Sequence, residues 1–174
     1  PWPNSIIFSG NYWGATCPEC PEGERDLMEN PRRGYNPDAD HPWIGRYGDD
    51  ESMENARLVR TAMNVVLDRQ SILDNVLGGY GEIGYSPMHT QFPPGTKYYR
   101  EEWTTPYDPE AGREMLALAG YPDGFPVEFY AYVDTPTFWD PEVSAAIAEM
   151  WRKELNLDVT IDRSAYATRR PSIL

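Results

Sequence analysis

The segment NARLVRTAMNVVLDRQSI, residues 55–72, carries apolar residues with the period of an α-helix. Two adjacent stripes recur every four residues, one made of Leu58, Ala62 and Val66 and the other of Val59, Met63 and Leu67. Such stripes mark the buried side of an amphipathic helix. The pattern continues through residues 71–77 and stops at Gly78-Gly79, which is typical of a helix end. We therefore expect helical structure from Asn55 onward with one face in a core.

The segment YDPEAGREMLALAGYPDGF, residues 107–125, predicts a second helix with clear ends. Asp108 is suited to the N-cap position, and Pro109 fits the first helical position because its missing N–H would have no partner there. Gly120 fits the helix end, and Pro122 just beyond it cannot continue a helix. These residues predict a helix that begins at Pro109 and ends at Gly120.

The sequence after this helix predicts a strand, a helix and a second strand. Residues 126–133 alternate, with Val127, Phe129, Ala131 and Val133 on one face. Asp140-Pro141 repeats the capping pattern of Asp108-Pro109, and the helix that follows has a buried stripe of Val143, Ile147, Met150, Trp151 and Leu155. Residues 157–162 alternate again. A right-handed βαβ unit with parallel strands is expected, so the fold class is α/β or mixed α+β.

Composition limits the classes of function. A formal net charge of −13 argues against a nucleic-acid surface, because phosphate binding needs clustered Lys and Arg. No segment approaches the roughly 20 apolar residues that a membrane span needs. The 174 residues suit one domain or slightly more. The chain opens on Pro1 and stops at Leu174 without a terminal signature, so we expect a piece of a longer protein.

The two helical segments share the order of a known family signature. The first supplies Val59, Arg60, Ala62, Asp68, Arg69 and Ile72, followed by a glycine-rich turn. The second supplies Tyr107, Asp108, Pro109, Leu116, Ala119, Gly120, Tyr121, Gly124 and Phe125. Together with the following strand, helix and strand, residues 55 to about 170 resemble the family 5 extracellular solute-binding proteins, the ligand receptors of peptide- and nickel-type ABC importers.

The resemblance implies one lobe of a two-lobed, periplasmic-binding-protein-like fold of type II, similar to cluster C. Residues 1–13 would be a strand and lead-in, residues 14–54 an irregular loop or insertion, and residues 55–174 a partial C-terminal lobe. The implied function is capture of an oligopeptide or a similar small solute, such as a sugar or metal chelate, between two lobes and delivery to a membrane ABC permease. The second lobe of the same protein is then a partner. We expect a periplasmic or extracellular protein, soluble or membrane-anchored, that is no enzyme and needs no cofactor.

Ligand contacts are expected downstream of the second strand. The resemblance implies that Tyr166, where the chain leaves that strand toward the cleft, packs on the ligand; an ordinary surface tyrosine is an equal alternative. Arg169 and Arg170 could bind a ligand carboxylate through their guanidinium groups, or lie in a terminal segment away from it. A structural role is favoured for the signature charges Arg60, Asp68 and Arg69, since their spacing fits a helix face.

Cys17 and Cys20 form a lone C-x-x-C motif between Pro18 and Pro21. Zinc is disfavoured, because only His41 and His89 could complete a site and their spacings match no common pattern. A local disulfide in an oxidising compartment is the favoured interpretation. Residues 36–47 begin like a calcium loop, but His41 and Tyr47 stand where such a loop needs Gly and Glu.

Two alternatives stay open from the sequence. Glu101-Glu102 and an aromatic content of 13% would suit a secreted carbohydrate-binding or carbohydrate-active domain, although adjacent acids in a loop more often face solvent. The proline-rich residues 14–54 could instead serve an adhesion or protein-interaction module. Gly-x-Ser-x-Gly, His-Glu-x-x-His and phosphate-loop motifs are missing from the sequence, which disfavours the common hydrolases and nucleotide-binding enzymes.

Overall fold

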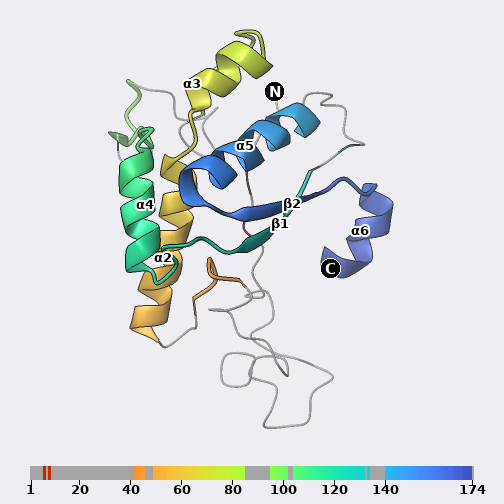
Figure 1. Ribbon diagram of the computed structural model, residues 1–174. Coiled ribbons are helices and arrows are strands. Elements are labelled where there is room, and N and C mark those ends of the chain that lie inside the picture. Colours follow the sequence, from red (N-terminus) through yellow and green to blue (C-terminus); the bar gives the residue numbers. More distant parts are fainter. Residues whose placement is uncertain are drawn as a thin grey trace.

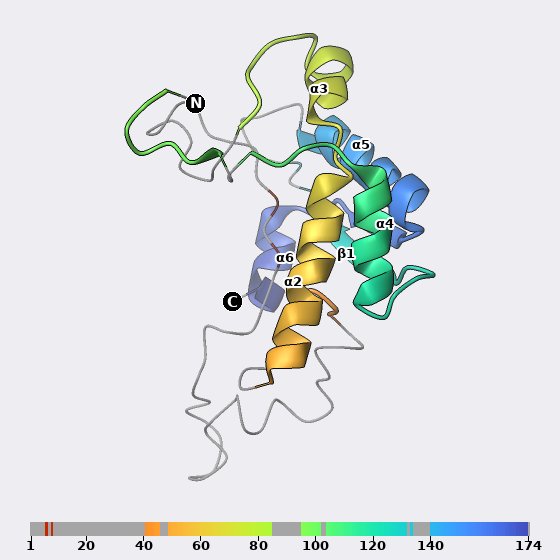
Figure 2. The same ribbon diagram turned by 90° about the vertical axis from the view of Figure 1, so that its left-hand side faces the viewer.

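A computed structural model describes residues 6, 8, 41–45, 49–84, 95–101, 104–131, 133 and 140–173. Helices α2 (Asp50–Val65) and α4 (Pro109–Leu118) lie side by side at one end of a small parallel sheet (Figure 1). Helix α5 (Asp140–Leu155) packs against α4 and against the sheet, and Figure 2 shows α2, α4 and α5 as neighbours. Helix α6 (Tyr166–Ile173) lies at the opposite end of the sheet (Figure 1).

Helix α2 begins at Asp50, earlier than the predicted Asn55 and inside the segment predicted to be irregular. Asp49 is the N-cap, and its carboxylate accepts a hydrogen bond from the Ser52 backbone N–H at 3.0 Å. Asp50 and Glu51 then place negative charge at the positive end of the helix dipole. The polar capping residues extend the helix ahead of its apolar stripe, so a prediction based on that stripe began too late.

The predicted continuation of this helix to residue 77 is interrupted. After α2 ends at Val65, Asp68 caps a short new turn, α3 (Arg69–Ser71), by accepting from the Ser71 N–H at 2.9 Å. That turn runs into a π-helical segment, η2 (Ile72–Val76). The chain then leaves through Gly78 and Gly79, whose φ angles of 60° and 79° favour glycine, as the sequence predicted.

The last carbonyl groups of α2 are bonded by groups from three other segments. The indole N–H of Trp151 in α5 donates to the Met63 carbonyl at 2.8 Å, and both residues are buried. The Asp108 backbone N–H donates to the Val65 carbonyl at 2.8 Å. Arg69 donates to the Asn64 carbonyl at 3.3 Å and also to the Asn64 side chain. Because helix ends leave such carbonyls without intrahelical partners, these bonds stabilise the helix end.

Helix α4 confirms the capping prediction. The Asp108 carboxylate accepts from the Ala111 N–H at 3.0 Å, and Pro109 occupies the first turn. The helix ends before Gly120, which adopts a φ of 94°. Gly112 faces α2 so closely that a Cβ atom there would lie 2.4 Å from Cγ1 of Val66. The lack of a side chain at Gly112 therefore permits the close approach of the two helices.

The parallel βαβ prediction is confirmed. Strand β1 (Pro126–Tyr130) pairs in parallel with β2 (Asp158–Asp162), in a register that places Val127 opposite Val159 and Phe129 opposite Ile161. β1 is shorter than predicted, and Val133 lies beyond it with 40% of its surface exposed. Asp140 was predicted to be the N-cap, with Pro141 as the first helical residue. Helix α5 instead begins at Asp140, one position earlier.

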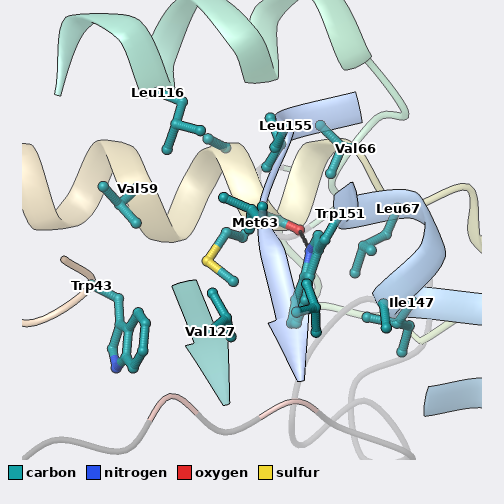
Figure 3. Packing of buried hydrophobic residues seen from close by; sticks show 14 of the residues in the cluster. Trp43, Val59, Met63, Val66, Leu67, Leu116, Val127, Ile147, Trp151 and Leu155 are labelled. Atoms are coloured by element: carbon teal, nitrogen blue, oxygen red, sulfur yellow. Dashed lines mark hydrogen bonds between the residues drawn. The ribbon is translucent and has the colours of Figure 1, made fainter. Parts of the chain in front are cut away.

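One apolar core joins the helices to the sheet, as Figure 3 shows. Its largest fully buried side chains are Trp151, Met63, Leu116, Val59 and Val66. The predicted stripe of α5 is buried at Val143, Ile147, Trp151 and Leu155, while Met150 is only partly buried. Trp43 and Ile44 are also buried in this cluster, and the Arg60 side chain donates to the Trp43 carbonyl at 2.6 Å. Residues 41–45 therefore belong to the same folded unit as α2.

Several predicted features fall on residues outside the described part of the chain. These are the Cys17–Cys20 disulfide, the loop resembling a calcium site at residues 36–40, His89, and Glu102 of the acidic pair. Of the strand and lead-in predicted at residues 1–13, only Ile6 and Phe8 are described; neither is in a strand, and both are partly buried against the core. Within the described residues, no helix is both long enough and apolar enough to cross a membrane.

Candidate functional site

The candidate site is the edge of the sheet where both strands end and α6 begins. Tyr130 closes β1 opposite Asp162, which closes β2, so the two carboxyl ends meet at one place. Helix α6 starts four positions after Asp162, at Tyr166, and lies next to this edge in Figure 1. Ligands of open α/β sheets bind outside the carboxyl ends of parallel strands, which makes this edge the first place to look for ligand contacts.

A short network of hydrogen bonds fixes the turn between β2 and α6. The Asp162 carboxylate accepts from the Ser164 backbone N–H at 2.8 Å. The Ser164 carbonyl accepts from the Tyr130 hydroxyl at 3.1 Å, which ties the turn to β1. Hydrogen bonds from the backbone and side chain of Ser164, and then the positive charge of Arg169, lower the pKa of Asp162 from its ordinary value of 3.8. Asp162 is therefore a carboxylate at neutral pH.

Arg169 joins α6 to both strands. Its guanidinium group forms an ion pair with Glu128 of β1 and lies 3.6 Å from the Asp162 carboxylate of β2. The side chains of Arg169 and Asp162 are 30% and 23% exposed, whereas Glu128 is 54% exposed. A ligand carboxylate would have to compete with these two protein carboxylates for Arg169. The assignment of Arg169 as a ligand contact therefore stays a prediction and is weaker than that of Tyr166.

Tyr166 is the first residue of α6 and keeps 37% of its surface exposed. Because it precedes Arg169 by three positions, the two residues lie on neighbouring parts of the same helix face. Arg170 follows in the same helix, but its side chain is outside the described part. The structure thus brings Tyr166 and Arg169 to the strand ends, and their contact with a ligand remains a prediction.

Sequence reasoning missed the residues that surround Arg169. Glu128 and Asp162 had been placed only by the alternation of the two strands, and Ser164 had not been singled out. The signal that could have found them is the register, because strand ends that pair in parallel bring Glu128 and Asp162 to one face of the sheet. The register was not available from the local pattern of either strand alone.

The signature charges lie away from this edge and have partners within the chain. Arg60 bonds the Trp43 carbonyl, Asp68 caps α3, and Arg69 bonds carbonyls at the end of α2. Burial lowers the pKa of Arg69 from its ordinary value, but a guanidinium stays charged at neutral pH. These contacts agree with the structural role predicted for the three residues, although they are specific hydrogen bonds and not a solvated helix face.

Other parts of the described surface offer weaker sites. One shallow depression lies at the opposite, amino ends of the strands, lined by residues 123–126 and 156–158. Another lies between the start of α2 and Tyr121, and both are open to solvent. Among the described residues, no group of three or more His, Cys, Asp or Glu side chains is arranged to hold a metal ion. The strand ends therefore remain the best candidate.

Comparison with known families finds one match to most of the chain. The family model described as bacterial extracellular solute-binding proteins, family 5 Middle, matches residues 41–172. The match begins before the predicted residue 55, in agreement with the packing of Trp43 and Ile44 into the core. The resemblance predicted from the paired helical segments is confirmed.

Two curated relatives and one solved structure are similar to parts of this chain. Heme-binding protein A of Haemophilus influenzae is 38% identical over 73 residues, which are 41% of this chain and 13% of that protein. Glutathione-binding protein GsiB of Salmonella typhimurium is 39% identical over 67 residues, 38% of this chain and 12% of that protein. The periplasmic binding protein AgaA of A. tumefaciens R10, in complex with agropinic acid, aligns with a TM-score of 0.56 at 23% identity.

The structural alignment covers 69% of this chain and 24% of AgaA. At this identity the likeness shows the fold alone, and it confirms a mixed helix and strand unit of the periplasmic-binding-protein type. The aligned stretches are a small part of each relative, far less than two thirds of its length.

Proposed function

We propose that this chain, which belongs to the bacterial extracellular solute-binding proteins of family 5, forms part of the ligand-capturing component of an ABC importer. Residues 55–174 would contribute to the C-terminal lobe, and the whole protein would close two lobes around a small solute. It would work in the periplasm or outside the cell, soluble or anchored, and deliver the solute to a membrane permease without chemical conversion.

The observation that carries the proposal is the strand-end edge with Tyr166 beside it. A tyrosine with 37% of its surface exposed, at the carboxyl ends of two parallel strands, can stack on a planar or extended solute without requiring one particular side chain. The neighbouring carboxylates and guanidinium supply polar groups that orient a solute. A lobe of this kind holds only one side of a cleft, so tight binding would need the second lobe.

We propose an oligopeptide or a similar small solute as the ligand class. The relatives carry names for heme and glutathione binding, and AgaA was solved with agropinic acid, so one scaffold holds chemically different solutes. Glutathione is itself a peptide. A peptide-like solute is consistent with an aromatic and charged strand end.

Isothermal titration calorimetry of the whole protein tests this function. The panel is glutathione, trialanine, hemin, agropinic acid and maltotriose, with each solute recovered afterwards and checked for chemical change. We expect at least one peptide-like solute to bind and to be recovered intact. Conversion of a solute to products would instead support an enzyme, and binding of maltotriose alone would support the carbohydrate-binding alternative.

Tyr166→Ala is the variant that links the function to this edge. Loss of an aromatic contact is expected to weaken solute binding by about tenfold, or ~1.4 kcal/mol. Tyr166→Phe keeps the ring and should bind nearly as well. Tyr80→Ala is the matched control, since Tyr80 is 88% exposed and lies beyond η2. Equal affinity of Tyr166→Ala and Tyr80→Ala would remove Tyr166 from the site.

A further inference from the structure

The charged groups at the strand ends form a three-part cluster. Glu128 lies two positions before Tyr130 on β1, and Tyr130 is paired with Asp162 on β2. Because side chains at alternate positions share a face of a strand, Glu128 and Asp162 project from the same face of the sheet. Arg169 reaches both from α6. One guanidinium therefore connects three secondary-structure elements.

The chemistry of Arg169 suits this position. A guanidinium group presents its N–H donors in a rigid planar fork, so it can bond two carboxylates at once. Without Arg169, the two carboxylates on one face would repel each other, and each would lose its attraction to the guanidinium group. Partial burial of Arg169 and Asp162 reduces the screening of their attraction by water. The cluster therefore holds α6 to the sheet by charge.

We propose that Arg169 is a positioning residue that holds α6, and with it Tyr166, on the carboxyl ends of β1 and β2. Tyr166 and Arg169 are three positions apart, so an anchored Arg169 fixes the rotation of the helix about its axis and the direction of the Tyr166 side chain. The role of this positioning in ligand binding rests on the proposed function, whereas the anchoring of α6 by Arg169 does not.

Amide hydrogen exchange in the whole protein, without ligand, tests the anchoring. The probes are the N–H groups of Thr168 and Arg169, which both bond the Ala165 carbonyl, at 2.9 and 3.1 Å. In Arg169→Met we expect their exchange to rise by about tenfold, while Phe129 and Thr160 in the strands change little. Arg169→Lys keeps the charge and should restore part of the protection. Glu128→Gln should give a smaller rise than Arg169→Met.

Arg57→Met is the matched control, because Arg57 forms an exposed ion pair with Glu54 on α2. It should leave α6 unchanged. Unchanged exchange of α6 in Arg169→Met would overturn the proposal, and so would an equal rise in α6 and in both strands, which would indicate a general loss of stability.

The dependence of α6 exchange on salt concentration tests whether the anchor acts through charge. At 1 M NaCl the screening length falls to about 3 Å, so α6 of the unmodified protein should exchange faster than at 0.05 M. Arg169→Met should lack this dependence on salt. The same dependence in both proteins would contradict a charge-based anchor. None of these measurements needs a bound solute. A negative result with the solute panel would therefore count against the proposed function and not against the anchoring of α6 by Arg169, and the reverse also holds.

Discussion

The carboxyl end of helix α2 and the carboxyl ends of strands β1 and β2 both collect polar groups from distant parts of the chain. At the end of α2, a buried indole and the Arg69 guanidinium bond backbone carbonyls. At the strand ends, Arg169 pairs with two carboxylates that remain partly exposed. The first arrangement completes a helix inside a core, whereas the second leaves charged and aromatic groups where a solute can reach them.

This difference separates the residues that identify the family from those that would meet a ligand. Asp68, Arg69 and Asp108 belong to the signature, and each caps or completes a helix end. Tyr166 and Arg169 lie outside the paired signature and beside the strand ends. The signature therefore describes the scaffold, and substitutions at the two ends should have different consequences.

The largest expected effect is at the buried end, from Trp151→Ala. Loss of a fully buried indole and of its bond to the Met63 carbonyl should lower the free energy of unfolding by about 3–5 kcal/mol. Trp151→Phe keeps most of the ring but leaves the carbonyl unpaired, so it should cost about 1–3 kcal/mol. Urea unfolding of the whole protein measures both. Tyr98→Ala is the control, since Tyr98 is 58% exposed. If Trp151→Ala lowered the free energy of unfolding no more than Tyr98→Ala, this role of Trp151 would be contradicted.

The contact between α2 and α4 should give the next largest effect. Replacing Gly by Ala inside a helix normally stabilises it by about 1 kcal/mol. Gly112→Ala should instead destabilise the protein by about 1–3 kcal/mol, because the new methyl group would overlap Val66. The double variant Gly112→Ala/Val66→Ala removes that overlap. Its loss of stability should therefore be smaller than the sum of the losses measured for the two single variants. Thermal unfolding that shows Gly112→Ala to be stabilised would rule out this close contact.

The smallest expected effect concerns pH at the strand ends. The pKa of Asp162 is lowered in the folded state, so its contribution to stability is complete above the ordinary value of 3.8 and is lost as pH falls through the folded pKa. Asp162→Asn should therefore lower the unfolding temperature slightly at pH 7. The difference between the two proteins should shrink when the same measurement is made at about pH 3. An equal difference at both pH values would contradict the depressed pKa.

Local sequence signals predicted the parts of the fold that depend on local chemistry. Asp108-Pro109 and Gly120 set both ends of α4 because capping involves residues within one turn. The alternation on either side of α5 predicted the parallel strands. The break after Val65 was missed because apolar residues continue through it, and only the bonds from Trp151, Arg69 and Asp108 show that the helix ends there.

The candidate site was less predictable than the fold. The resemblance pointed to Tyr166, and the chemistry of the guanidinium group suggested Arg169 and Arg170. The structure places Tyr166 and Arg169 in α6 at the strand ends. The carboxylates that engage Arg169 could not be identified, since Glu128 is 41 positions away and its proximity depends on the register of the sheet. The packing of Trp43 onto α2 was missed for the same reason, because the surrounding segment has no regular period.

The crystal structure of the whole protein with its tightest-binding solute tests the central claim most directly. We expect the solute to lie outside the carboxyl ends of β1 and β2, with the Tyr166 ring within about 4 Å of its atoms. A solute that contacts the opposite end of the sheet, near Asp123 and Asn156, and lies far from Tyr166 would contradict it.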